Sequence, residues 1–327
     1  MLKLTARRFA AALLVVVLMF LSACGGGSSA GPSAGSEATP VPDKEAATRS
    51  FDTVKGKVQI PVKPKRIVTD YYGGELLAVG ANVVGVEPTT FDNPFLKDKL
   101  KGAADVGTQV NPEKTLELAP DLIVVMYDTN YEALSKIAPT LYLPFGTAKN
   151  IEETVKLFGD IAGEKEKAEK FMADFNQKAA QGREKLKGVI DENATFGLYE
   201  LTNKGDLWIF GDNAGRGGQA VYNALKLKMP SKTSGSAEQT VQLSMEVLPD
   251  YAADYMFLTS YDPENKGEAL KQLQDSSVWK GLKAYKNNTI FYNDFNTFYR
   301  YDPIAVMAQI DLVVDMLTKR SEENKKK

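Results

Sequence analysis

Short runs of β-branched and aromatic residues alternate with amphipathic stretches along residues 51–327. A short apolar run bounded by turn residues is typical of a buried strand, and apolar positions three and four apart are typical of a helix. Regular alternation of such strands and helices predicts an α/β fold built from two similar halves. The predicted strands are Ile67–Thr69, Val83–Val86, Leu122–Val125 and Leu141–Leu143 in the first half, and Thr195–Leu201, Leu207–Phe210, Tyr255–Leu258 and Ile290–Tyr292 in the second.

The middle of the chain is predicted to form two consecutive helices. Asn150 and Glu153 fit a capping pair at the start of the first, and Gly163 suits its end. The second helix, residues 164–188, is heavily charged. Its buried stripe is formed by Ala168, Phe171 and Phe175. Such a helix is expected to be a rigid spine between two lobes.

These patterns predict two α/β lobes joined by a single long helix. The N-terminal lobe covers residues 51–163, the interlobe helix residues 164–188, and the C-terminal lobe residues 189–327. Residues 24–50 are rich in Gly, Ser, Ala, Pro and Thr and lack apolar periodicity, so they cannot bury a core. We expect them to be a flexible linker.

The pattern of residues 1–23 is that of an export signal. A positively charged start precedes an apolar run, residues 9–21, that is too short to span a bilayer permanently. The run ends in Leu21-Ser22-Ala23-Cys24, which resembles the lipidation box of a bacterial lipoprotein. We therefore expect lipid on Cys24, a membrane anchor and an extracytoplasmic location. The alternative is an ordinary secretory signal that happens to contain a cysteine.

Composition narrows the classes of function. Lys and Arg number 40 against 42 Asp and Glu, so no basic footprint for nucleic acid is visible. The chain has no His and one Cys, which excludes Ser-His-Asp and Cys-His catalysis and His-ligated metal sites. A hydrolase with a carboxylate pair survives this filter. A binding protein is the other class that remains.

The two halves also share a spacing of acidic residues. Glu113 precedes Asp121 and the strand after it, and Glu246 precedes Asp254 and the corresponding strand. The separation is eight residues in both halves, since 121 − 113 equals 254 − 246. Acidic residues are common at helix starts, so chance is one explanation. In a two-lobed repeat, the same spacing places equivalent carboxylates on equivalent surfaces.

Several motifs resemble one class of binding protein. Pro64-Lys65-Arg66-Ile67-Val68, Val110-Asn111-Pro112-Glu113-Lys114 and Pro120-Asp121-Leu122-Ile123 are similar to the first lobe of the class III periplasmic binding proteins that serve iron-siderophore and cobalamin importers. Gly211-Asp212-Asn213-Ala214-Gly215-Arg216-Gly217-Gly218 resembles a segment of Gram-positive ferric-hydroxamate-binding lipoproteins. The tryptophan of that segment is replaced here by Ala214, which removes a large face from the cleft.

The resemblance implies roles for individual residues. Arg216 matches an arginine that donates to ligand oxygens around the metal, and Trp208 and Tyr299 match aromatic residues of the pocket. Glu113 and Glu246 match two surface glutamates that dock onto arginines of an ABC importer permease. Trp208 on a strand is alternatively a core residue.

Three further candidates come from their positions in the sequence. Tyr71 and Tyr72 follow the strand Ile67–Thr69 in a loop, where ligand sites concentrate, although tyrosines are common in exposed loops. Arg300 is a candidate ligand residue, with a solvated charge or an interlobe ion pair as alternatives. It also makes the expected cleft more basic, which suits a carboxylate- or catecholate-bearing chelate.

Together these observations predict a monomeric, lipid-anchored receptor for a ferric siderophore, favouring a hydroxamate, on the outer face of a Gram-positive cell membrane. It needs no cofactor or direct metal ligand, because a siderophore already saturates its iron, and it is not expected to be an enzyme. The alternatives are ferric citrate or a catecholate, another bulky chelate such as a corrinoid or haem, and the carboxylate-based secreted hydrolase.

Overall fold

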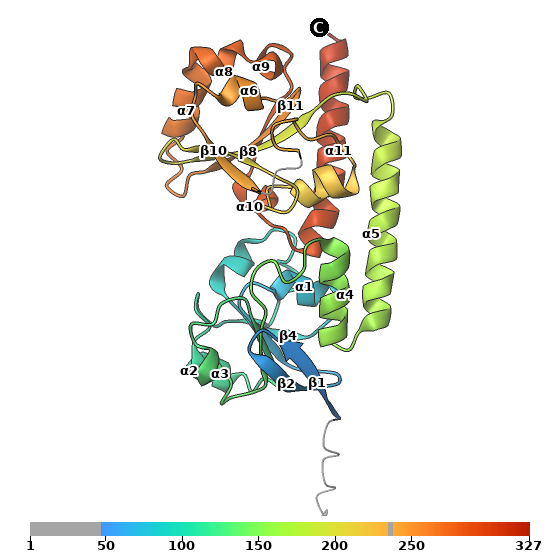
Figure 1. Ribbon diagram of the computed structural model, residues 1–327, viewed down its shortest axis with the longest axis vertical. Helices are drawn as coiled ribbons and strands as arrows, with labels where there is room; N and C mark the ends of the chain where they lie inside the picture. Colours follow the sequence, from blue (N-terminus) through green and yellow to red (C-terminus); the bar gives the residue numbers. More distant parts are fainter. Residues whose placement is uncertain (1–46, 235–237) are drawn as a thin grey trace, which may run out of the picture. The chain divides into compact units, whose positions relative to one another are not determined.

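Two five-stranded sheets form the framework of the computed structural model, which describes residues 47–234 and 238–327 (Figure 1). The first sheet has the order β5-β4-β3-β6-β7, and all its neighbouring strands are parallel. Its strands are β3 (Ile67–Thr69), β4 (Val83–Val86), β5 (Ala104–Asp105), β6 (Leu122–Val125) and β7 (Thr140–Tyr142). The helices of this lobe are α1 (Gly73–Ala78), η1 (Pro88–Asp92), α2 (Pro112–Glu117), α3 (Tyr131–Leu134) and α4 (Ile151–Ile161).

The second sheet has the corresponding strand order, β10-β9-β8-β11-β12. Strands β8, β11 and β12 are parallel, whereas β9 is antiparallel to both of its neighbours. The strands are β8 (Phe196–Thr202), β9 (Leu207–Phe210), β10 (Thr240–Leu243), β11 (Tyr255–Tyr261) and β12 (Ile290–Asn293). The helical segments between and after these strands are η2 (Gln219–Ala224), α6 (Leu248–Tyr251), α7 (Glu268–Asp275), α8 (Ser277–Gly281), α9 (Lys283–Lys286) and α10 (Phe295–Phe298).

The predicted strands are all present. β3, β4, β6 and β9 have the predicted bounds, because each is a buried apolar run that ends at turn residues. β7 and β8 are shifted by one residue, and β11 continues to Tyr261. Two features were not predicted: the hairpin of β1 (Thr48–Thr53) and β2 (Gly56–Pro61), and the short edge strands β5 and β10. Their exposed residues interrupt any apolar run.

The acidic repeat corresponds to equivalent positions in the two lobes. Asp121 precedes β6 and accepts hydrogen bonds from the amides of Lys65 and Arg66, just before β3, at 2.7 and 2.8 Å. Asp254 precedes β11 and accepts from the amide of Thr195, just before β8, at 2.9 Å. Each aspartate thus ties the start of its strand to the central strand beside it.

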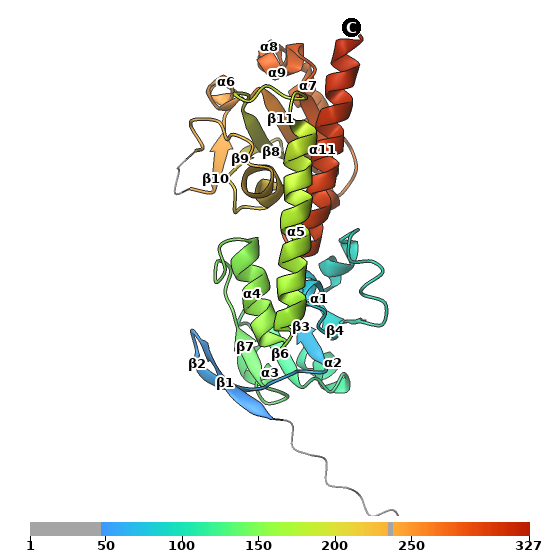
Figure 2. The ribbon, with the colours of Figure 1, turned by 90° about the vertical axis from the view of Figure 1, so that its right-hand side faces the viewer.

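Two long helices run beside each other. α5 (Lys165–Leu186) is the predicted spine, and α11 (Pro303–Lys325) packs along it (Figures 1 and 2). The Asn150 side chain caps α4 by accepting from the Glu153 amide at 2.9 Å, as predicted. Ala168 and Phe175 are buried on α5, and Phe171 is half-buried.

Two predicted boundaries need correction. The linker predicted through residue 50 ends earlier, because β1 begins at Thr48 and Arg49 forms an ion pair with Asp160 of α4 at 3.2 Å. The last helix was assigned wholly to the C-terminal lobe, but α11 also contacts α1 and α4 of the first lobe. Its buried residues, including Val306 and Ile310, belong to a core cluster that also contains Leu76 and Phe158.

The start of α11 lies directly against α1. A Cβ atom at Gly74 would be 2.4 Å from Cγ of Asp302, the residue that caps α11. The same carboxylate accepts a hydrogen bond from Nδ2 of Asn93 at 2.8 Å. Glycine at position 74 therefore allows the close approach of the two lobes at this point.

We expect Gly74→Ala to lower the free energy of unfolding by about 1–3 kcal/mol, because the added methyl group must displace Asp302 or α1 in a packed region. Urea denaturation measures the change. Gly281→Ala is the matched control, since nothing lies within 4 Å of a Cβ at that helical position. Equal stability of the two variants would show that α1 and α11 are not tightly packed.

Candidate functional site

A large pocket lies at the carboxyl ends of the strands of the second sheet. This main pocket, about 1030 Å³, is lined by residues at or after the ends of β8, β11 and β12 and by Tyr71, Thr89 and Asp92 of the first lobe. Ligands of open α/β sheets bind at this edge, because loops there converge from several strands. The residues from β8, β11 and β12 are Glu200–Asn203, Ser260–Asp262 and Asn293–Phe295.

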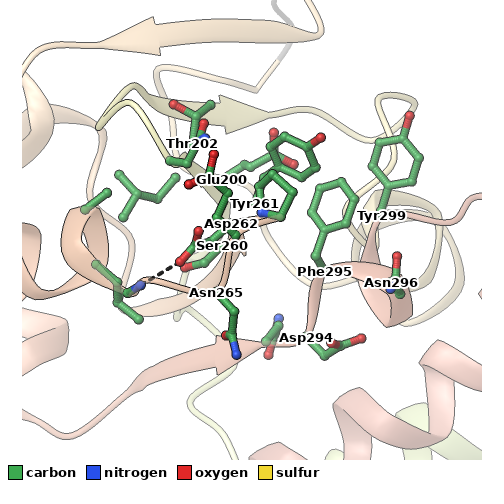
Figure 3. A pocket seen from close by; sticks show the side chains of 18 of the residues that line it. Glu200, Thr202, Ser260, Tyr261, Asp262, Asn265, Asp294, Phe295, Asn296 and Tyr299 are labelled. Atoms are coloured by element: carbon green, nitrogen blue, oxygen red, sulfur yellow. Dashed lines mark hydrogen bonds between the residues drawn. The ribbon is translucent and has the colours of Figure 1, made fainter. Parts of the chain in front are cut away.

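A continuous row of aromatic rings and one guanidinium forms a wall of the main pocket. The rings of Tyr261 and Phe295 are 4.8 Å apart between centroids, and those of Phe295 and Tyr299 are 4.7 Å apart (Figure 3). Cζ of Arg216 lies 4.7 Å from the Tyr299 centroid and 4.4 Å from that of Phe210. This wall presents a large apolar area together with N–H donors.

Arg216 is positioned by its glycine-rich turn and by one ion pair. Gly215, Arg216 and Gly217 all have positive φ, of 79°, 54° and 89°, so the chain makes a tight turn that glycine favours on both sides. Nε of Arg216 donates to Oε2 of Glu200 at 2.7 Å, and both side chains are largely buried. Because a guanidinium has five N–H donors, others remain for ligand oxygens.

Arg300 joins the two lobes at the mouth of the pocket. Its Nη2 donates to the carbonyl oxygen of Thr89 at 2.8 Å, and its Cζ lies 5.5 Å from the Tyr299 ring centroid. Nε is buried and has no hydrogen-bond partner among the described residues. Gln309 of α11 donates to the carbonyl oxygens of Thr297 and Arg300, at 2.8 and 2.9 Å, and fixes this segment.

A second, smaller pocket adjoins the first. This side pocket, about 270 Å³, shares Tyr71, Arg216, Tyr299 and Arg300 with the main pocket, and Ala214 also lines it. Its other lining residues include the carboxyl groups Glu75, Glu87 and Asp302. Ala214, which stands where the similar lipoprotein segment has a tryptophan, therefore lies at this pocket.

Three carboxyl groups at or near the side pocket, those of Asp70, Glu75 and Asp302, have raised pKa values. Burial raises the pKa of Asp70 to about 6, although the amides of Met126, Tyr71 and Tyr127 donate to it. Burial and the neighbouring charge of Asp302 raise the pKa of Glu75 well above its usual value. Burial also raises the pKa of Asp302. Removal from water disfavours each charged form.

The predicted ligand residues divide between the pockets and the core. Tyr71, Arg216, Tyr299 and Arg300 line both pockets. The structure contradicts the prediction for Tyr72, which is 7% exposed, lines neither pocket and donates to the carbonyl oxygen of Leu143. The reason is that Tyr72 immediately precedes α1, where its ring packs against Phe158 with centroids 4.9 Å apart.

Trp208 occupies an intermediate position. It is half-buried on β9, opposite Glu200 in the register with β8, and it packs against the core cluster rather than lining either pocket. The contacts of Trp208 are therefore those of a core residue and not of a pocket residue.

Glu113 and Glu246 are both exposed and line neither pocket. Glu113 lies in α2, as predicted, and follows the edge strand β5. Glu246 follows the edge strand β10, but it lies in the turn before α6 rather than opening that helix. The two glutamates are thus in corresponding places in the two lobes.

Other predictions concern membranes and metals. Cys24 and the export signal lie outside the described residues. No helix in the described part of the chain is long and apolar enough to cross a membrane. Among residues 47–234 and 238–327, no three His, Cys, Asp or Glu side chains are arranged to hold a metal ion.

Several pocket residues were not predicted from the sequence. Tyr261 and Phe295 each lie three residues beyond the end of a predicted strand, where pocket residues are expected, and this position was the available signal. Glu200 is a single acidic residue in an apolar strand, which indicates a buried partner. Thr89 and Glu75 carry no signal in the sequence that distinguishes them.

Comparisons with known proteins agree with this arrangement. Residues 72–297 match the family model described as periplasmic binding protein. The chain is 56% identical over 297 residues to the iron(3+)-hydroxamate-binding protein YxeB of Bacillus subtilis, covering 90% of this chain and 92% of that protein. It is 34% identical to the iron(3+)-hydroxamate-binding protein FhuD of B. subtilis, covering 89% and 93%. The structure of FhuD2 from Staphylococcus aureus with bound ferrioxamine B has a TM-score of 0.70 at 29% identity, covering 79% of this chain and 100% of that chain.

We expect Arg216→Ala to lower the free energy of unfolding by about 3 kcal/mol, because it leaves the buried Glu200 without its partner. Urea denaturation of the variant measures this loss. The double variant Arg216→Ala with Glu200→Gln should recover much of the stability, since the uncompensated charge is then removed. If the double variant is no more stable than the single one, the ion pair is not the source of the loss.

Proposed function

The chain belongs to the periplasmic binding protein family, and from this premise we propose that it captures a ferric siderophore of the hydroxamate type between its lobes and delivers it to an ABC importer. The observation that carries the proposal is the main pocket, whose wall combines Tyr261, Phe295 and Tyr299 with the guanidinium of Arg216. The relatives named for iron(3+)-hydroxamate binding support the same ligand class.

The chemistry of a ferric hydroxamate fits such a wall. Its iron is already saturated by the oxygens of the siderophore, so the protein supplies no metal ligand. Aromatic rings provide contact area at a small cost in side-chain entropy, and guanidinium donors form charge-assisted hydrogen bonds with the oxygens around the metal. A chain without histidine is sufficient for this task.

A carboxylate-bearing ferric chelate is the second candidate. It is favoured by Arg300, whose buried Nε has no partner among the described residues and whose side chain lines both pockets. A ferric citrate would present carboxylates to this donor. The same panel of ligands that tests the first proposal distinguishes the two.

Catalysis is not part of the proposal. The buried carboxyls Glu75 and Asp302 are close enough for their charges to interact, but both oxygens of Asp302 accept structural hydrogen bonds, from the Ala305 amide and from Nδ2 of Asn93. A hydrolase needs carboxyl groups that are free to exchange protons with substrate or water. The family match favours a binding protein.

The proposed lipid anchor and the proposed contact with the permease rest on the sequence. Lipid on Cys24 would hold the protein on the outer face of the cell membrane, with the residues between Cys24 and β1 as the tether. Glu113 and Glu246 would then meet basic groups of the permease. Their exposure, their separation from both pockets and their corresponding positions after the two edge strands support this role.

We expect a ferric trihydroxamate to quench tryptophan fluorescence with a dissociation constant in the micromolar range or below, corresponding to about 8 kcal/mol or more. The iron-free siderophore should bind more weakly, because it is not preorganised around the metal. Ferric citrate and a ferric catecholate complete the panel. The proposal is wrong if none of these complexes binds, and tightest binding of citrate would favour the second candidate.

A matched pair of tyrosines locates the binding site. Tyr261 and Tyr285 are 42% and 41% exposed, but only Tyr261 lines the main pocket. In the same titration, Tyr261→Ala should weaken binding several-fold by removing one ring of the wall, and Tyr285→Ala should have no effect. Equal effects would place the ligand elsewhere.

We expect the double variant Glu113→Arg with Glu246→Arg to abolish siderophore uptake by cells while leaving the soluble protein's ligand affinity within about twofold, because charges at an interface rim act on docking. Uptake of radioactive iron measures the first effect and fluorescence titration the second. Glu169→Arg with Glu192→Arg is the control, since both glutamates are exposed and line neither pocket. Normal uptake by the first double variant would remove the docking role.

A further inference from the structure

Asp70 joins the carboxyl ends of two neighbouring strands of the first sheet, β3 and β6. It follows β3 directly, is 2% exposed and accepts a hydrogen bond from the amide of Tyr71 at 2.6 Å. Its two oxygens also accept from the amide of Met126, which follows β6, at 2.9 and 2.8 Å, and Oδ2 accepts from that of Tyr127 at 3.1 Å. One carboxylate thus ties together the two loops that leave these strands.

These two loops carry tyrosines that line the pockets. Tyr71 lines both pockets, and Tyr127, which is 57% exposed, lines the side pocket. Their rings meet edge to face with centroids 5.5 Å apart. Both tyrosines and Asp70 also line a third cavity of about 220 Å³ in the first lobe. Because the rings border open space in more than one cavity, their positions depend on the backbone bonds to Asp70.

The charge of Asp70 is stabilised by backbone N–H groups. Burial raises its pKa to about 6, the three amides oppose this rise, and the neighbouring carboxylate of Glu87 adds to it. Arg216 and Arg300 line the side pocket, which Asp70 does not line. The ionisable side chains that interact with Asp70 are carboxyl groups and phenols, those of Glu75, Glu87, Tyr71, Tyr72 and Tyr301.

Protonation of Asp70 would disturb the tie between the loops. An ionised carboxylate accepts at both oxygens, whereas a protonated carboxyl group turns one oxygen into an O–H donor. Here Oδ1 faces the amides of Tyr71 and Met126, and Oδ2 faces those of Met126 and Tyr127. A proton on either oxygen therefore weakens the bonds to one loop, and the tyrosine of that loop is held less firmly.

We propose that Asp70 is a positioning residue for Tyr71 and Tyr127, and that the ligand binds tightly only while its carboxylate is ionised. Rings that are already fixed need little ordering when a ligand binds, so the tie contributes to affinity without touching the ligand. The inference rests on the proposed function and adds a regulation to it: the affinity for the ferric chelate is lost as the pH falls through about 6.

The first test measures the affinity for ferrioxamine B, the ligand of the S. aureus relative, by fluorescence titration at pH 7 and pH 5. The primary ammonium and the iron-bound hydroxamates of this probe keep their charges over this range. We expect the dissociation constant of the native protein to rise by about fivefold to tenfold, because the ionised fraction of a group with a pKa of about 6 falls from about nine-tenths to about one-tenth.

Two variants assign this pH dependence. Asp70→Asn at pH 7 should bind about as weakly as the native protein at pH 5, and its affinity should change by less than about twofold between the two pH values. Asp121→Asn is the matched control, because Asp121 also accepts two backbone amides and ties β3 to β6, but at their starting ends and away from both pockets. It should keep the native pH dependence. Thermal unfolding at both pH values shows whether each variant is folded.

Nuclear magnetic resonance of the native protein gives a test that needs no variant. The amide signals of Tyr71, Met126 and Tyr127 should titrate together near pH 6. The gallium complex of the same siderophore, which is diamagnetic, should move this titration to lower pH, because a ligand that prefers the ionised form must also favour ionisation.

The inference is refuted, while the proposed function stands, if the native affinity is equal at pH 5 and pH 7, or if its pH dependence survives in Asp70→Asn. Loss of the dependence in Asp121→Asn as well would also refute it, since any tie between the strands would then suffice, and so would an amide titration that the gallium complex leaves in place. If ferrioxamine B binds at neither pH, the proposed ligand class fails and the inference fails with it.

Discussion

The contact of Asp302 with α1 is the constraint on which both pockets depend. Asp302 caps α11, accepts from Asn93 of the first lobe and lies where Gly74 leaves no side chain in its way. Residues 299–301 immediately precede it, so the same contact sets the position of the Tyr299 ring and the Arg300 guanidinium. Nε2 of Gln309, in α11, donates a hydrogen bond to the carbonyl oxygen of Arg300 at 2.9 Å. The part of the pocket wall formed by Tyr299 and Arg300 is therefore held in place by the interlobe packing.

The proposed ligand would be recognised by contact area and by a few hydrogen-bond donors. Ordering flexible side chains on binding costs free energy, whereas stacked rings and a guanidinium held between Phe210 and Tyr299 are already ordered. The ion pair of Arg216 with Glu200 has the same effect, since it fixes the plane of the guanidinium while leaving further N–H groups for the ligand. The buried charges are thus arranged for binding geometry, at some expense of folding stability.

The sequence predicted the lobes and strands better than the site. Apolar runs define β3, β4, β6 and β9, because burial is a property of each short segment by itself. The site depends on contacts between segments about 210 residues apart, such as Arg300 with Thr89, which no local pattern encodes. Tyr72 shows the limit: two adjacent tyrosines point to different places, Tyr71 into the pockets and Tyr72 into the core. Only the packing of α1 against Phe158 decides between them.

The internal repeat separates the pockets from the two surfaces that carry Glu113 and Glu246. In each lobe an aspartate, Asp121 or Asp254, ties strands together at their starting ends, while the pocket residues follow their carboxyl ends. The edge strands β5 and β10 lead to Glu113 and Glu246 on surfaces that neither pocket includes. A duplicated lobe thus places one exposed glutamate on each of two similar surfaces, and the two pockets combine unlike residues from both lobes. Because the helices α5 and α11 connect these regions, the spacing between the two glutamates depends on how α11 packs against α1 and α4.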